Sequence, residues 1–137
     1  MKLQMGIAEI LYLALLKLAA IPSTPSSMKL CAKINTNRLG ADVTEFTKQK
    51  NELLSKYGKK NDSGNFSIAP NDKNWKDFMG EYEPLIKQEA DFNIATCAYN
   101  QDEFYEMLFG LGKDVDAVNL SMDEIDILKL ICKQEKE

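Results

Sequence analysis

The stretch GIAEILYLALLKLAA, residues 6–20, decides how the rest of the chain can fold. Glu9 and Lys17 are its only charged residues. They stand eight positions apart, so a helix of 3.6 residues per turn places them close together around its axis, in one narrow polar stripe. Such a pattern predicts a helix that is packed on most of its sides. We expect it to lie at the centre of the fold, entered through a short strand at residues 1–5.

A secretion signal and a membrane anchor are the alternative interpretations of this stretch. Lys2 and the pair Ala19 and Ala20 loosely fit the basic end and the cleavage site of a signal peptide. However, lipid penalises both a carboxylate and an ammonium within the run, and the run is shorter than the roughly 20 residues that cross a bilayer. A buried helix of a soluble domain is the favoured interpretation.

The composition bounds the class of protein. The chain has 137 residues, of which 45% are hydrophobic, and this suits a single domain over residues 1–137. It contains no histidine, which excludes Ser-His-Asp and Cys-His nucleophiles and histidine metal ligands. Arg38 is the single arginine. Because guanidinium is the preferred group for reading guanine and phosphate, we expect no sequence-specific nucleic-acid binding.

The three cysteines, Cys31, Cys97 and Cys132, are widely spaced and form no Cys-x-x-Cys pair. Disulfide frameworks and zinc sites need closer or even-numbered sets. The pattern therefore predicts free, mostly buried thiols in a reducing cytosol, and it indicates no cofactor.

Charge is distributed unevenly along the chain. Residues 28–60 carry eight basic and three acidic side chains, whereas residues 61–137 carry seven basic and seventeen acidic ones. One interpretation is two solvated faces of a single domain. The other is an acidic surface offered to a basic partner, or a dipolar molecule that stacks head to tail as a homo-oligomer.

Turn and cap residues divide the first part of the chain. IPSTPSS, residues 21–27, predicts a turn in which Ser26 or Ser27 caps a long helix that Gly58 ends. A polar loop is expected over residues 59–65 and a short strand over residues 66–70, which Pro70 closes.

The middle of the chain carries weaker signals. Asn71 or Asp72 is expected to cap a third helix, whose continuity Gly80 and Pro84 put in question because proline removes a helical hydrogen bond. DFNIATCAY, residues 91–99, favours a strand through its β-branched and aromatic content.

Two capping boxes open the last helices. In NQDE, residues 100–103, Asn100 and Glu103 are placed to satisfy each other's backbone N–H groups, and SMDE, residues 121–124, repeats the device. The tail KQEKE, residues 133–137, should fray. The predicted fold class is α+β and mostly helical, with about five helices and two or three short strands.

Two motifs that look like ligand-binding loops are better explained as turns. GLGKD, residues 110–114, lacks the first glycine of a P-loop and the hydroxyl residue after Lys113, so it predicts a helix-ending turn. DVDAVN, residues 114–119, begins like a calcium loop, but Val118 and Asn119 stand where an oxygen ligand and a glycine are needed. We therefore expect no metal site.

The candidate partner-binding residues are Asp114, Asp116, Asp123, Glu124, Trp75 and Tyr82. The acids suit either a solvated loop with helix-start carboxylates or a surface for a basic partner. Trp75 and Tyr82 lie seven positions apart on one helical face, which suits core packing or an exposed aromatic anchor. No residue is predicted to be catalytic.

The order of features around EFTKQKNELLSKYGKKNDSGNFSI, residues 45–68, resembles small accessory proteins of tailed bacteriophages. The shared layout is a long helix ending in Leu-Leu-x-x-Tyr-Gly, a basic Asp-x-Gly-Asn turn, a short extended piece, and an aromatic helix leading to DFNI. It covers about residues 1–95 and the closing helix. The resemblance implies a phage or prophage protein and transfers no active site. It does not explain the lack of histidine or the turn at residues 21–27.

These observations lead to one expected function and two alternatives. We expect a non-enzymatic phage or prophage-encoded binding protein that occupies a host protein in the bacterial cytoplasm, of the host-takeover or anti-defence inhibitor type, with no membrane contact. The first alternative is a structural or assembly component of the virion, and the second is a small enzyme using carboxylates and a metal. An acidic half that steers association with a basic protein is consistent with the first expectation.

Overall fold

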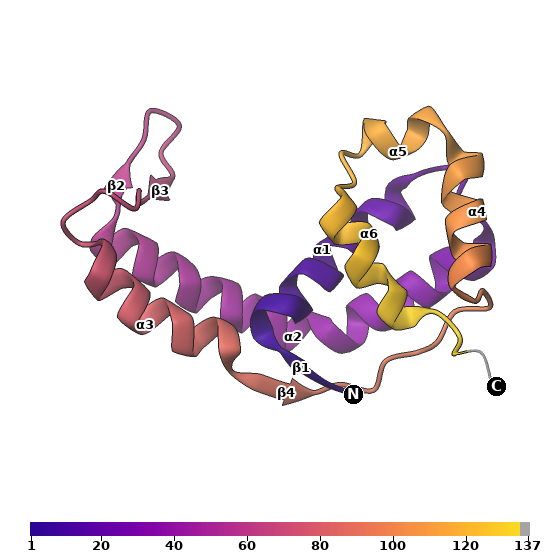
Figure 1. Ribbon diagram of the computed structural model, residues 1–137, viewed down its shortest axis with the longest axis horizontal. Coiled ribbons are helices and arrows are strands. Elements are labelled where there is room, and N and C mark those ends of the chain that lie inside the picture. The colour runs from indigo at the N-terminus through magenta and orange to yellow at the C-terminus, as the bar shows by residue number, and fades with distance from the viewer. Residues whose placement is uncertain (135–137) are drawn as a thin grey trace.

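Residues 1–134, described by a computed structural model, fold mostly into helices (Figure 1). The elements in chain order are β1 (Lys2–Gln4), α1 (Met5–Ala20), α2 (Ser26–Tyr57), β2 (Lys59–Lys60), β3 (Phe66–Ser67), α3 (Trp75–Lys87), β4 (Glu89–Asp91), α4 (Gln101–Leu111), α5 (Lys113–Ala117), α6 (Met122–Leu128) and the 3-10 helix η1 (Lys129–Ile131). The expectation of a mostly helical chain with short strands is confirmed, with six α-helices in the described residues rather than about five. Of the tail expected to fray, residues 135–137 lie outside the described residues.

Helix α1 is the central element that its sequence predicts. It packs antiparallel against α2, with α6 along another of its sides (Figure 1). Its buried side chains are Met5, Ala8, Leu11, Ala14, Leu15 and Leu18. The prediction of a helix packed on most of its sides is confirmed.

The two charges of α1 bind two different neighbours instead of sharing one polar stripe. The Glu9 carboxylate accepts hydrogen bonds from Lys50 (2.6 Å) and Thr47 (2.8 Å) on α2. The Lys17 ammonium donates to Glu124 on α6 (2.7 Å). The charges therefore link α1 to α2 on one side and to α6 on another through partly buried ion pairs.

Helix α2 connects the two ends of the molecule. Its 32 residues give a length of about 48 Å at 1.5 Å per residue. Helix α3 and the β2–β3 hairpin lie at one end, and α4, α5 and α6 gather around the other (Figure 1). Gly58 ends α2 as predicted, but the predicted cap at Ser26 or Ser27 is wrong. Both serines lie inside the helix, because Pro25 occupies the N-cap position and its carbonyl accepts from the Lys29 N–H (3.0 Å).

Helix α3 starts later than its sequence predicts, and neither Gly80 nor Pro84 interrupts it. It begins at Trp75, whereas a cap was expected at Asn71 or Asp72. The Asp72 carboxylate instead accepts from the Asn74 N–H (2.8 Å), which holds a turn before the helix. The helix also continues through Pro84, because packing against α2 and α1 outweighs the lost hydrogen bond.

Two short antiparallel pairings and one isolated parallel bridge, between Asn100 and Lys133, complete the secondary structure of the described residues. Strand β1 pairs with β4, with Leu3 opposite Ala90, and β2 pairs with β3. The strand expected at residues 1–5 is present as three residues and the one expected at residues 66–70 as two. Strand β2 forms at the start of the segment expected to be a polar loop.

The strand expected over residues 91–99 does not form beyond Asp91. Its backbone is held by side chains and by a distant segment rather than by a neighbouring strand. The Ala95 N–H donates to Asn35 Oδ1 (2.7 Å), and Asn35 Nδ2 donates back to the Ala95 carbonyl (2.9 Å). The Cys97 N–H donates to the Ile131 carbonyl (2.7 Å). At its start the Phe92 N–H donates to the Met1 carbonyl (2.8 Å), and at its end Asn100 forms an isolated parallel bridge with Lys133. Between these two points the segment pairs with no strand, and the hydrogen bonds to Asn35 and Ile131 hold it instead.

The cysteines are free and buried, as predicted. Burial and the nearby Cys97 raise the pKa of the Cys31 thiol to about 11 and that of Cys132 to about 12. Because the thiolate is the nucleophilic form, these two thiols are poor nucleophiles at neutral pH. Both side chains belong to the buried core.

Candidate functional site

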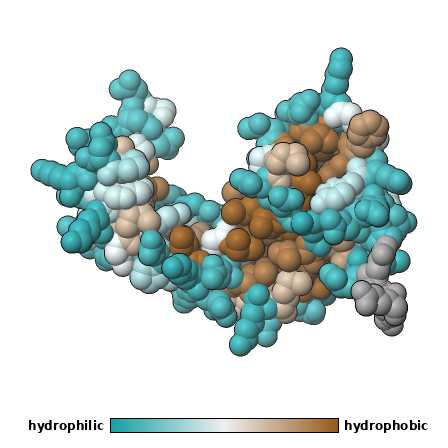
Figure 2. Space-filling view, viewed as in Figure 1, coloured by the Kyte–Doolittle hydropathy of each residue, from teal (hydrophilic) through white to brown (hydrophobic). Residues whose placement is uncertain are grey.

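Helices α4, α5 and α6 surround an open apolar groove at one end of the molecule. Its volume is about 700 Å³. The residues that line it are Tyr105, Leu108, Phe109, Gly112, Val115, Asp116, Met122, Ile125 and Asp126. Figure 2 shows the apolar surface that gathers in the hollow between these three helices, with hydrophilic residues around it. This groove is the candidate functional site.

The local sequence explains how the groove is built. The Asn100 capping box, present as predicted, starts α4, and Gly112 ends it with a φ of 56° that favours glycine. The chain then turns through the short α5, where a loop was expected, and the capping box of Ser121 starts α6, also as predicted. The three helices are therefore joined by short connections, which leaves their facing apolar sides around one hollow.

Two side chains that flank the groove are unusually exposed. Phe109 is 88% exposed and Met122 is 71% exposed, which are the highest values among the large apolar residues of the described chain. Single exposed apolar residues are ordinary on protein surfaces, whereas a cluster beside a groove is typical of an interaction site. These two residues therefore mark the groove as a surface that favours burial by a ligand.

The helices around the groove are strongly acidic. Residues 100–128 contain eight carboxylates and one lysine, Lys113. Asp116 and Asp126 line the groove itself, and Asp123 is exposed in the first turn of α6. The groove thus combines apolar side chains with carboxylates, an arrangement that attracts positively charged molecules.

The structure separates the acids predicted to bind a partner. Asp116 lines the groove and Asp123 is exposed on α6, beside Met122. Asp114 is exposed and accepts a hydrogen bond from the Ser23 hydroxyl (2.8 Å), which ties α5 to the turn after α1. The two residues closest to the predicted role are therefore Asp116 and Asp123.

Glu124, also predicted to bind a partner, is bound within the fold. Its carboxylate accepts from Lys17 (2.7 Å) and from the backbone N–H of Ser121 (3.1 Å), and Lys17 also donates to the Asn119 carbonyl (3.0 Å). Burial pushes the pKa of the Glu124 carboxyl upward, but the hydrogen bonds from Lys17 and Ser121 outweigh it, and the pKa is lowered. Glu124 thus fixes α6 on α1 and positions one wall of the groove.

Replacing Lys17 with alanine is expected to lower the free energy of unfolding by about 1 to 2 kcal/mol at neutral pH. This figure lies between the losses that are typical of breaking an exposed and a buried ion pair. The lowered pKa of Glu124 contributes stability above its ordinary value of 4.5, which is lost as the pH falls below that value. Urea unfolding at several pH values should show the Lys17→Ala deficit shrinking in acid. A deficit that is independent of pH, or one equally large for exposed Lys48→Ala, would contradict this account.

The aromatic candidates lie elsewhere. Trp75 and Tyr82 are half-buried on α3, towards the opposite end of α2 from the groove (Figure 1). Both rings pack on the buried Phe78, at centroid distances of 5.8 Å and 5.0 Å, and Tyr57 contacts Phe78 from α2. These contacts favour core packing over an exposed anchor. The predicted binding residues therefore form no single surface.

The residues that sequence reasoning missed are Phe109 and Met122. A signal for Phe109 was present in α4, where apolar residues occupy more of the helix circumference than one buried face requires. Phe104 and Leu108 turn into the core, whereas Tyr105 and Phe109 follow the adjacent face. Met122 gave no such signal, because it is the first residue of its helix.

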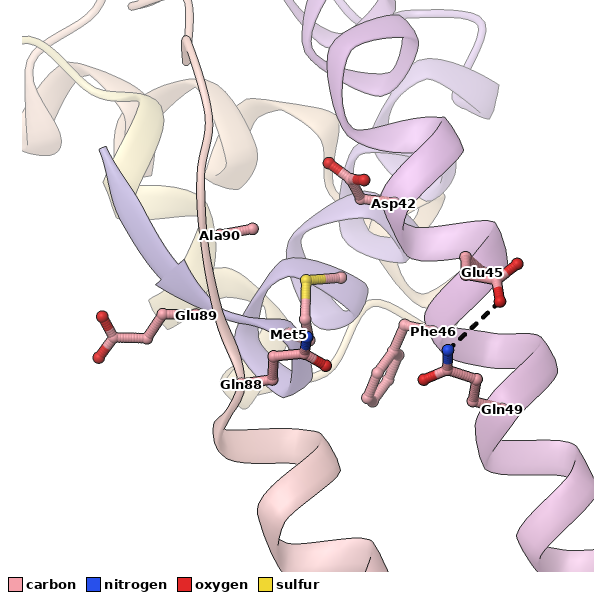
Figure 3. Close-up of a pocket in the computed structure, with 8 residues that line it drawn as sticks. All are labelled: Met5, Asp42, Glu45, Phe46, Gln49, Gln88, Glu89 and Ala90. Carbon is pink, nitrogen blue, oxygen red and sulfur yellow. Dashed lines mark hydrogen bonds between the residues drawn. The ribbon is translucent and has the colours of Figure 1, made fainter.

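A second hollow lies between α2, the first residue of α1 and strand β4, with a volume of about 140 Å³. Figure 3 shows Met5 and Phe46 at its centre, while the carboxylates of Asp42, Glu45 and Glu89 point in different directions. General acid–base work needs groups that converge on one reacting atom. This hollow is therefore a weaker candidate than the groove.

Comparison of the chain with protein-family models, with curated proteins and with solved structures finds no match. None of the helices within residues 1–134 has the length and apolar character that crossing a membrane requires. Within the same residues, no group of three or more acidic or cysteine side chains is arranged to hold a metal ion. The functional proposal therefore rests on the groove and its charge.

Proposed function

We propose that this chain is a non-enzymatic, phage or prophage-encoded binding protein that occupies a host protein in the bacterial cytoplasm. The α4–α5–α6 groove is its binding surface. The observation that supports this function is the exposure of Phe109 and Met122 beside one apolar groove. Burying a side chain of this size contributes about 1.5 to 3 kcal/mol. The free protein lacks this contribution for both residues, and a partner that covers them would gain it.

The chemistry of the chain supports a role without catalysis. Histidine is absent, so the commonest general base is missing. Two of the thiols have raised pKa values and are buried, which removes them as nucleophiles. The carboxylates around the smaller hollow diverge. What remains available at the surface is shape, apolar area and negative charge, which are the properties of a binding protein.

A structural or assembly component of a virion is the second candidate, and one observation favours it. Leu30 is 60% exposed on α2, between Lys29 and Lys33 in the basic part of the chain. A basic, partly apolar surface on one copy would complement the acidic groove of the next and produce head-to-tail assembly, which need not close.

A pull-down from host lysate, with and without infection, tests the proposed function. The bait is compared with two variants, Phe109→Ala/Met122→Ala at the groove and Leu30→Ala outside it. We expect a stoichiometric host protein that the groove variant loses and the Leu30 variant retains. Recovery of phage structural proteins, or a solution mass that rises with concentration and falls in the Leu30 variant, would favour the virion component instead. Capture that is equal for all three baits would refute the groove as the binding surface.

A further inference from the structure

We propose that the groove between α4, α5 and α6 accepts a basic amphipathic helix of the partner protein, with lysine or arginine side chains set against Asp116 and Asp126. This inference rests on the proposed function and names the chemistry of the partner. It follows from three properties of the groove, which are its exposed apolar edges, its helical walls and its charge.

The exposed edges indicate a partner larger than the groove. Phe109 and Met122 line the hollow, yet 88% and 71% of their surfaces remain open to solvent. A small apolar molecule that filled the hollow would leave the outer surfaces of both side chains in water. Only a macromolecule that extends over both side chains covers them, and apolar anchors that a partner buries usually dominate binding energy.

The walls of the groove indicate a helix and not an extended peptide. Apart from Gly112, every lining residue belongs to α4, α5 or α6, so none of them lies in a strand. Even at the turn, Gly112 N–H donates to Phe109 and its carbonyl accepts from Val115 (3.1 and 3.3 Å). No strand edge is offered, so an occupant of this apolar surface has to satisfy its own backbone hydrogen bonds. A helix does so, and its side chains at spacings of three and four residues reach into the groove.

The charges indicate that the helix is basic. Within residues 1–134, no cation forms an ion pair with Asp116, and Asp126 meets only Lys129, at 3.9 Å. Both carboxylates lie at the edge of an apolar surface, where water is removed when a partner docks. A cationic side chain from the partner compensates for that loss and steers the encounter, whereas an acidic helix would be repelled.

Fluorescence anisotropy with a panel of labelled peptides tests the inference. Each peptide is an amphipathic helix of about five turns with large apolar residues at helical spacing, and the panel varies that spacing. Every basic peptide has two matched control peptides, one with glutamate in place of lysine and one with a scrambled sequence. We expect at least one basic peptide to bind at least tenfold more tightly than both of its control peptides, and we expect this difference in affinity to shrink as the salt concentration is raised.

Groove variants supply the structural control. Phe109→Ala should weaken binding of the basic helix by about thirtyfold, which is the loss expected of an apolar anchor that the partner buries. Asp116→Asn/Asp126→Asn should weaken it by about tenfold at low salt and bring its affinity close to that of the glutamate helix. Asp62→Asn/Glu83→Gln, which removes two exposed carboxylates at the opposite end of α2, should leave binding unchanged.

The outcomes separate this inference from the proposed function. Equal binding of basic and acidic helices, lost together in Phe109→Ala, would overturn the charge requirement and leave the groove as a binding surface. If no helix of the panel binds while Phe109→Ala/Met122→Ala still loses the host protein, the helical partner is wrong and the proposed function stands. If self-association is what Phe109→Ala abolishes, the occupant is a second copy of this chain and the inference is overturned.

Discussion

Replacing Asn35 with alanine is expected to lower the free energy of unfolding by about 2 to 4 kcal/mol, because each backbone group that loses its partner costs about 1 to 3 kcal/mol. The Asn35 side chain is fully buried on α2 and exchanges two hydrogen bonds with the backbone of Ala95. Ala95 is half-buried, so water recovers part of the loss. Urea unfolding measures the change. If the slope of the unfolding free energy against urea concentration is unaltered, the variant exposes the same amount of surface on unfolding.

Two substitutions sharpen this test. Asn37→Ala lies two residues along the same helix, where the side chain is exposed, and should change stability by less than about 0.5 kcal/mol. Asn35→Asp keeps an acceptor for the Ala95 N–H but places a carboxylate against the Ala95 carbonyl. Burial beside that carbonyl should raise the pKa of the introduced carboxyl group in the folded state. This variant should therefore regain stability as the pH falls, because the protonated acid can donate to the Ala95 carbonyl. An Asn35→Ala deficit no larger than that of Asn37→Ala would show that Asn35 does not hold residues 91–99.

Asn35 also shows where sequence reasoning stops. Its position in a long helix is predictable, but nothing in its neighbours indicates that its amide will take the place of a strand partner for a segment sixty residues away. The β-branched and aromatic residues of 91–99 indicate an extended backbone, and the backbone is extended. Whether such a segment becomes a strand depends on what lies beside it, and that is a property of the tertiary fold.

Features that depend on contacts within a few residues were predictable. Both capping boxes form as their sequences indicate, since donor and acceptor are three positions apart. The buried α1 was predictable from the width of its apolar face, and the end of α2 from Gly58. The cap of α2 was not, because a serine and a proline both suit a helix start and only the path of the preceding turn decides between them.

The candidate site was predictable only as charge. The excess of acids after residue 100 indicates a negative surface, and Asp116 does line the groove. The apolar half of the site depends on how α4, α5 and α6 are arranged, and their hollow is created by the turn at Gly112. Sequence reasoning therefore identified an electrostatic property of the surface and missed the groove that gives it a location.

Two phenylalanines on α4 provide the second prediction, because the same residue type stands in opposite environments five positions apart. Phe104 is fully buried, whereas Phe109 is 88% exposed. Phe104→Ala is expected to cost about 3 to 5 kcal/mol, through lost burial and the cavity that remains. Phe109→Ala is expected to change stability by less than about 0.5 kcal/mol. Chemical unfolding of both variants against the unmodified chain measures the difference.

The contrast between Phe104 and Phe109 bears on binding as well as on stability. A side chain that belongs to the core is needed by the free protein, so its removal lowers stability and disrupts binding only indirectly. A side chain kept in water for a partner can be removed from the free protein without cost, and its loss appears only in affinity. If Phe109→Ala destabilises the chain as much as Phe104→Ala does, Phe109 serves the fold and the groove is not a free binding surface. Unchanged stability together with weakened partner binding is the result that a docking surface requires.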